Sequence, residues 1–313
     1  MYHFELDKKL AGSVARIDGG QHDNKCVHIE EYSKEKDTKK KKEQFLKELS
    51  MSEYELDLKS LPKSERPKIR KLLEDAFLKG YTEEDIDDAS AKPLYKKILD
   101  NEAKNDKIVI HDGKFTVVPM KDKFQLFYCV GACGSGKSYM ALNIAKNYKK
   151  IYPKREVYLI SKLPEDSTLD KGKFIKRIKA ETFLDEAPTI EEFSDSLVIV
   201  DDYESFEKKL YEAVIKLIND IASMGIHYNI NMICCQHNFT NYKATRLMLN
   251  EMTHVIVYPS SASNQALKYL LGTYCGLDTK QIQEVKKAKS RWVVVHKHHP
   301  NFIMTEDEIK FMS

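Results

Sequence analysis

The chain has 313 residues, enough for one large domain or two ordinary ones. Hydrophobic residues make up 42% and charged residues 32%. The sequence contains no run of about eighteen apolar residues, which a membrane-spanning helix would need. The net charge of +3 is too small to indicate nucleic-acid binding by itself, and the first ten residues lack the apolar core of a secretory signal.

Residues 1–105 differ in composition from the rest of the chain. More than two fifths of them are charged, against about a quarter of the residues that follow. A lysine run at 39–42 and an acidic run at 83–88 flank a short amphipathic segment at 69–77. We therefore expect a charged, mostly helical, partly ordered extension over 1–105 that serves as an arm, a tail or a partner-binding element. A solvated surface segment without a specific task is the alternative.

From about residue 107, short apolar runs alternate with helical patterns. The runs predict strands at 108–110, 115–118, 124–130, 157–160, 174–178, 197–200, 230–235, 255–258, 292–296 and 302–304. The helical patterns lie at 137–149, 204–224, 244–251, 263–274 and 279–287. Several strands are apolar on both faces, as in a parallel sheet covered by helices. We therefore predict an α/β domain over 106–313 with a mainly parallel central sheet. Six cysteines without paired spacing predict free thiols in a reducing compartment.

The strongest chemical signal follows the strand predicted at 124–130. Residues 131–138 fit the P-loop pattern G-x-x-x-x-G-K-[ST] between a strand and a helix. Glycines let the backbone N–H groups point at phosphate oxygens, and the helix adds its positive dipole end. Lys137 is expected to contact the β- and γ-phosphates, and the Ser138 hydroxyl to bind Mg²⁺. The predicted nucleotide-binding residues are Gly131, Ala132, Cys133, Gly134, Ser135, Gly136, Lys137 and Ser138.

Two carboxylates end the apolar strand predicted at 197–200. Asp201 is expected to complete the Mg²⁺ shell, and Asp202 to act as general base on the attacking water. Glu204 is a rival for the second role. Capping of the following helix is the alternative for Asp201 and Asp202.

A polar residue also ends the strand predicted at 230–235. Gln236 is predicted to sense the γ-phosphate or to orient water, with His237 as the alternative. Arg246 and Arg291 are candidates for an arginine finger. The planar guanidinium of such a finger stabilises charge on the equatorial phosphate oxygens. A finger that acts in trans would require a ring of subunits. Each arginine is otherwise a surface salt-bridge residue.

The chain lacks the Asn-Lys-x-Asp element of GTPases and the arginine-rich lid of small-molecule kinases, which favours an ATPase. Residues 107–304 resemble the genome-packaging ATPases of large double-stranded DNA viruses, which belong to the FtsK–HerA class of P-loop motors. The resemblance rests on the collinear order of several stretches, among them Gly131–Ser138, Val198–Asp202, Gln236-His237, Thr245-Arg246 before Asn250-Glu251, and Ser290-Arg291-Trp292.

This resemblance implies ATP hydrolysis by a homo-oligomeric ring that pumps double-stranded DNA into a capsid without sequence preference. It assigns the metal and catalytic acids to Asp201 and Asp202 and the sensor to Gln236, and it favours Arg246 as the finger. Ile226 stands where many members have arginine, so any role of that arginine is lost or moved here. A capsid or portal protein is the implied partner, no membrane is involved, and the implied location is the assembly site in the infected cell's cytoplasm or the virion. The alternatives are a related motor for single-stranded DNA or virion assembly, and a nucleotide-binding switch that hydrolyses poorly.

Overall fold

The computed structural model describes residues 2–31, 35–49, 53–103, 107–185, 187–239 and 245–312. The chain divides into two compact units, one of Met1–Glu5 and Ile29–Ile108 and one of Leu6–His28 and Val109–Ser313. The change of unit after Ile108 lies close to the boundary predicted at 105/106. Residues 6–28 nevertheless group with the second unit, because strand β2 (Ala15–Asp18) pairs antiparallel with β5 (Lys114–Val117).

Within the described residues, the main sheet has ten strands in the order β4-β14-β13-β12-β11-β6-β10-β9-β7-β8. The neighbouring strands from β11 to β8 are all parallel: β11 (His254–Val257), β6 (Leu126–Val130), β10 (Asn231–Gln236), β9 (Ser196–Asp201), β7 (Glu156–Ser161) and β8 (Ile175–Lys179). The sheet continues antiparallel through β12 (Val293–His296), β13 (Phe302–Met304) and β14 (Glu308–Phe311), and ends at β4 (Lys107–Val109). The predicted α/β class with a mainly parallel central sheet is confirmed.

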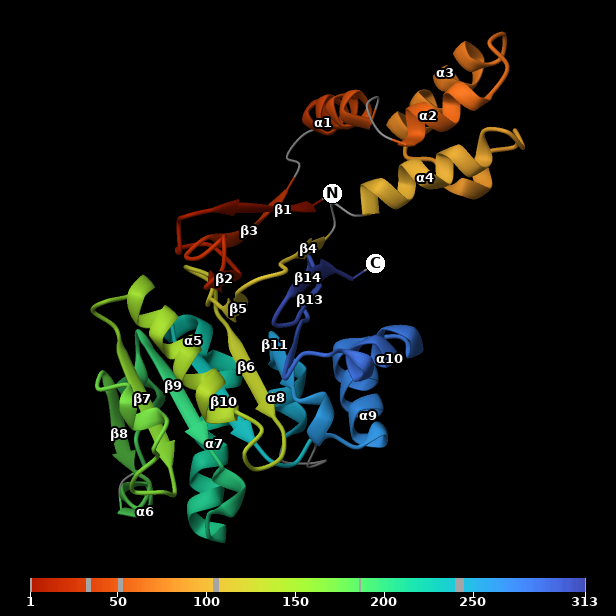
Figure 1. Cartoon of the computed structure of the whole chain (residues 1–313). Coiled ribbons are helices and arrows are strands. Elements are labelled where there is room, and N and C mark those ends of the chain that lie inside the picture. Colours follow the sequence, from red (N-terminus) through yellow and green to blue (C-terminus); the bar gives the residue numbers. More distant parts are fainter. Residues whose placement is uncertain are drawn as a thin grey trace. The chain divides into compact units, whose positions relative to one another are not determined.

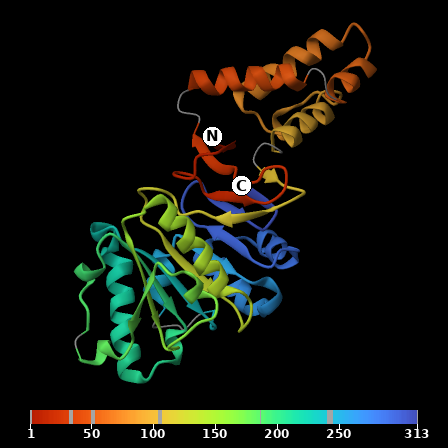
Figure 2. The same ribbon diagram turned by 60° about the vertical axis from the view of Figure 1, so that its left-hand side comes forward.

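Helices cover both faces of this sheet (Figures 1 and 2). Helix α5 (Lys137–Ile151) contacts β6, β10, β9 and β7. On the opposite face, α7 (Lys208–Met224) buries Val214, Ile218 and Ile221 in one core cluster with Tyr128 and Val130. The same face carries α8 (Arg246–Glu251), α9 (Asn264–Cys275) and α10 (Thr279–Lys287). Since β6, β10 and β9 are adjacent and parallel, their carboxyl ends lie at one edge of the sheet, where α5 begins.

Short elements complete this part of the fold. They are helix α6 (Thr182–Asp185) and the 3₁₀ turns η3 (Leu169–Lys171), η4 (Ile190–Phe193), η5 (Tyr203–Ser205), η6 (Gly225–Tyr228) and η7 (Pro259–Ser261). The helix predicted from Glu204 thus starts at Lys208, because η5 comes first. The helix predicted from residue 244 is seen from Arg246, and its predicted start lies outside the described residues.

The N-terminal region is helical from Glu35 onward but begins with strands. A second sheet has the order β1-β3-β2-β5, with β1 at Tyr2–Asp7 and β3 at Cys26–Glu31. Helices α1 (Glu35–Leu49), α2 (Glu53–Ser60), α3 (Arg66–Lys79) and α4 (Lys92–Ala103), with the turn η1 (Glu83–Asp85), follow. Figure 1 shows these helices in orange. Their core includes Leu73, Phe77 and Tyr95. None of the helices in the described ranges is long and apolar enough to cross a membrane.

Candidate nucleotide-binding site

The loop between β6 and α5 curls at two glycines with positive φ. Gly134 and Gly136 have φ of 74° and 114°, a region that side chains with a Cβ rarely adopt. The loop starts where the Gly131 N–H donates to the Gln236 carbonyl at 3.1 Å. The first N–H groups of α5 have no carbonyl partner within the helix, so the loop and helix together present donors to an anion.

The Lys137 ammonium lies inside this loop. Its Nζ donates to the carbonyls of Gly131 at 3.0 Å and Ala132 at 3.2 Å, and the side chain is only 6% exposed. Phosphate oxygens are stronger, charged acceptors than these carbonyls, so a bound phosphate would compete for the ammonium. The role of Lys137 in phosphate binding stays a prediction.

Strand β9 delivers Asp201 to the same edge of the sheet. Asp201 is paired in register with Ser161 of β7 and Cys235 of β10, and it is 4% exposed. Burial, followed by the nearby carboxylates of Asp202 and Asp166, raises the pKa of Asp201 to about 7, while the Lys137 ammonium opposes this shift. A divalent cation would favour the ionised carboxylate. Mg²⁺ commonly binds through one or two carboxylates plus substrate phosphates, so Asp201 and the Ser138 hydroxyl fit that ion.

Asp202 is connected to Lys137 through His237. The Asp202 backbone is left-handed with φ of 49°, a strained conformation that recurs at functional sites. Its Oδ1 lies 3.0 Å from His237 Nε2, and His237 Nδ1 lies 3.3 Å from Lys137 Nζ. The imidazole ring thus lies between the Asp202 carboxylate and the Lys137 ammonium, although its contact with Oδ1 lacks the geometry of a hydrogen bond. His237 is therefore the strand-end side chain that contacts the P-loop lysine.

Gln236 occupies the other face of β10. It is fully buried beside Val130, and its Oε1 accepts a hydrogen bond from the Tyr128 hydroxyl at 3.1 Å. Within the described residues its side-chain nitrogen has no partner, and the side chain is not hydrogen-bonded to any P-loop side chain. The alternation of strand side chains explains this placement, since Cys235 shares the face of Asp201. The sensor role of Gln236 stays a prediction.

Glu204 is engaged with the segment that follows β10. One carboxylate oxygen, Oε2, accepts from the backbone N–H of Asn238 at 3.3 Å and from its side-chain amide at 3.1 Å. The other oxygen is buried without a partner in the described part of the chain. Glu204 thus connects η5 to the segment that follows β10.

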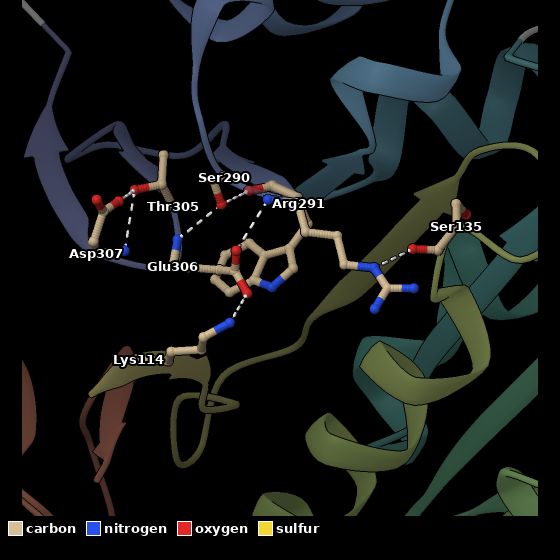
Figure 3. A network of polar contacts seen from close by, with 8 residues as sticks. Lys114, Ser135, Ser290, Arg291, Thr305, Glu306 and Asp307 are labelled. Atoms are coloured by element: carbon tan, nitrogen blue, oxygen red, sulfur yellow. Dashed lines mark hydrogen bonds and ion pairs between the residues drawn. The ribbon is translucent and has the colours of Figure 1, made fainter. Parts of the chain in front are cut away.

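The two candidate arginines lie in different settings. Arg246 is exposed at the start of α8. Arg291 instead contacts the P-loop of its own chain, where Nε donates to the Ser135 carbonyl at 2.8 Å (Figure 3). Its Nη2 donates to the Gly134 carbonyl at 3.2 Å. In this position its guanidinium is a contact in cis, which leaves Arg246 as the candidate for a finger acting on a neighbouring subunit.

Glu306 anchors Arg291 from the other side. Its carboxylate accepts from the Arg291 backbone N–H at 3.0 Å and from Lys114 Nζ at 2.8 Å (Figure 3). Burial opposes ionisation of Glu306, but the Arg291 N–H and the Lys114 ammonium outweigh it, so its pKa is lowered. The network joins β5, the end of β13 and the P-loop. Sequence patterns did not predict it, because its members are far apart along the chain.

Solved structures similar to the chain include the DNA-packaging ATPase B204 from Sulfolobus turreted icosahedral virus, with a TM-score of 0.42 and 15% identity over 58% of this chain and 97% of B204. Another is the cytoplasmic domain of the type VII secretion ATPase EccC from Thermomonospora curvata, with a TM-score of 0.40 and 11% identity over 58% of this chain and 25% of EccC.

No family model matches the chain. A curated relative, the uncharacterized protein V3 of the Sputnik virophage, is 34% identical over 222 residues, which cover 70% of this chain and 89% of V3. On this identity over most of both sequences, the chain belongs to the family of the virophage protein V3.

Proposed function

We propose that this protein binds ATP with Mg²⁺ and hydrolyses it to drive double-stranded DNA into a viral capsid. One observation carries the hydrolytic part: the buried Lys137, the buried Asp201 and the His237–Asp202 pair converge at the end of three adjacent parallel strands. A P-loop lysine beside an acid pair is the equipment that phosphoryl transfer to water needs.

Each group has a proposed task. The N–H groups of Gly131–Ser138 hold the phosphates, and Lys137 moves from its loop carbonyls onto the β- and γ-phosphate oxygens. Ser138 and Asp201 hold Mg²⁺, which supplies charge neutralisation on the transferred group. Arg246 of one subunit would complete the neighbour's site in trans, and Gln236 would respond to the γ-phosphate through Tyr128 and the end of β10.

Asp202 is the better-placed base of the two candidates. His237 connects its carboxylate to Lys137, so departure of Lys137 onto a phosphate frees one ring nitrogen while the other stays next to the carboxylate. Glu204 already accepts two hydrogen bonds from Asn238. We therefore assign proton acceptance from the attacking water to Asp202 and the positioning of its carboxylate to His237.

The packaging role is supported by the collinear motifs of residues 107–304 and by the viral source of the V3 relative. In this proposal the protein works as a homo-oligomeric ring that contacts DNA phosphates without sequence preference, at the assembly site of the infected cell and next to a capsid or portal protein. Packaging contacts of this kind predict binding that weakens steeply as salt rises.

Mixing of inactive variants tests the ring and the finger together. Lys137→Ala removes the phosphate lysine from its own site, whereas Arg246→Ala removes the finger from the neighbour's site. Each variant alone should hydrolyse ATP at least a hundredfold more slowly than the unaltered protein, and mixed rings should regain turnover where an intact site meets an intact finger. Arg70→Ala, at an exposed ion pair of α3, is the matched control and should keep full activity. Full activity of Arg246→Ala alone would remove Arg246 from the mechanism.

A further inference from the structure

A cavity of about 410 Å³ lies beside the P-loop, within the unit that contains the main sheet. One wall is formed by Gly136, the N-cap residue of α5, and by Tyr139, Met140 and Asn143 on one face of that helix. Strand β5 and the segment before β12 form the others. Pockets of a few hundred Å³ with mixed aromatic and polar walls are the usual size and type for small organic ligands.

Aromatic side chains dominate the part of the cavity next to the P-loop. Trp292 and Tyr258 line it and are 9% and 1% exposed, and Tyr139, which directly follows Ser138, is 62% exposed. A large exposed ring at a cavity wall offers a surface on which a planar ligand can stack. Aromatic side chains stack on nucleobases regardless of sequence, because every base has a π-face.

Charge determines which half of a nucleotide fits. The carboxylates of Asp18 and Glu306 line the cavity and disfavour a triphosphate inside it. The two cations that line the cavity already have partners: Lys114 is paired with Glu306, and the Arg291 guanidinium donates to P-loop carbonyls. Asn143 contributes an amide, which offers a donor and an acceptor in one plane and matches the N6 and N7 edge of adenine.

Arg291 and Gly136 connect the cavity to the phosphate site. Both residues line the cavity and both belong to the contact with the P-loop, since a Cβ on Gly136 would lie 3.3 Å from the Arg291 guanidinium. A ligand whose phosphates occupy the loop would therefore leave the loop at the mouth of this cavity.

We propose that the cavity binds the nucleoside half of ATP, with the adenine stacked on Tyr139 and Trp292, its edge on the Asn143 amide, and the ribose beside Gly136. This assignment rests on the nucleotide binding proposed above. It makes Tyr139 and Asn143 specificity-determining residues of that site, and it makes Arg291 the link between the base cavity and the phosphate loop.

The experiment compares ATP with inorganic triphosphate on the full chain by calorimetry. Triphosphate occupies the P-loop but has no base, so Tyr139→Ala should weaken ATP binding roughly tenfold or more and leave triphosphate binding unchanged. Tyr139→Phe keeps the ring and should keep the affinity. Asn143→Leu should reduce the preference for ATP over UTP. Tyr81→Ala, at an exposed ring of the helical unit, is the matched control.

The chain's single tryptophan gives a second readout. Saturating ATP should change the emission of Trp292 more than saturating triphosphate does, because only ATP places a ring against the indole. If both ligands bind and Tyr139→Ala weakens neither or both equally, the base assignment is overturned while nucleotide binding stands. If neither ligand binds the unaltered protein, the proposed function fails, and the base assignment fails with it.

Discussion

Replacing Asp201 with asparagine is expected to stabilise the ligand-free protein at alkaline pH while abolishing ATP hydrolysis. Asp201 is almost fully buried, and its pKa rises from 3.8 to about 7 on folding, chiefly through burial. The folded protein therefore holds this proton more tightly than the unfolded chain does. The resulting stability is fully present below about pH 4 and is lost as the pH rises through 7.

The size of the effect follows from the shift. About three pKa units at 1.36 kcal/mol each correspond to about 4 kcal/mol lost between acid and alkaline pH. Between about pH 5.5 and pH 8, the free energy of unfolding of the unaltered protein is expected to fall by about 2 kcal/mol through Asp201. Asparagine carries no charge at either pH, so its advantage over the natural residue should be about 2 kcal/mol larger at pH 8 than at pH 5.5.

Urea unfolding of both proteins at the two pH values measures this difference. Groups that titrate alike in both proteins cancel in the comparison, and Asp87→Asn, at an exposed position, serves as the matched control. Saturating ATP with Mg²⁺ should raise the stability of the unaltered protein at pH 8 more than that of Asp201→Asn. An equal advantage of asparagine at both pH values would refute the argument that burial of this carboxylate is costly.

Three further substitutions test separate parts of the structure. His237→Ala removes the side chain between Lys137 and Asp202, so kcat for ATP hydrolysis should fall roughly 10- to 100-fold with little change in ATP affinity. His237→Asn should restore part of the rate. An unchanged kcat in His237→Ala would contradict a role of His237 in positioning Asp202. Gly136→Ala places a Cβ on a residue with φ of 114°, 3.3 Å from the Arg291 guanidinium, so ATP affinity measured by calorimetry should fall at least tenfold. Gly80 also has a positive φ but has open space where a Cβ would lie, so Gly80→Ala should leave the ATP affinity unchanged. Leu73→Ala in the helical unit should lower the free energy of unfolding in urea by about 2–5 kcal/mol, because Leu73 is fully buried. Leu72→Ala, next to it, should lower that free energy by less than about 1 kcal/mol, because Leu72 is 38% exposed. Equal losses would contradict the assignment of Leu73 to this core.

The loop proposed to bind phosphate can be recognised from the sequence because its pattern is local. Eight consecutive residues between a strand and a helix supply the loop, the lysine and the hydroxyl, so neither register nor topology is needed to recognise them. Asp201 is predictable for a similar reason, since an apolar strand that ends in carboxylates places them at the carboxyl edge of a parallel sheet. Helix α10 matches its predicted bounds at Thr279–Lys287, since Asp278 caps its start.

The groups that sequence patterns placed less well depend on long-range pairing. Whether Gln236 or His237 faces the P-loop is decided by the register of β10 between β6 and β9, which alternation within one strand does not reveal. Arg291 reaches Ser135 from 156 residues away. Strands β1 to β3 were not predicted, because many of their residues are partly exposed and charged. In addition, β2 pairs with β5, from which the whole helical segment separates it in sequence.

The central claim is that this chain is a DNA-coupled ATPase, and steady-state ATP hydrolysis by the full chain tests it most directly. The assay compares the unaltered protein and Lys137→Ala, with Mg²⁺, in the presence and absence of duplex DNA. We predict turnover that requires Mg²⁺, rises when duplex DNA is added and is absent in Lys137→Ala. ATP binding without turnover, unchanged by duplex DNA, would contradict the claim and identify the protein as a nucleotide-binding switch.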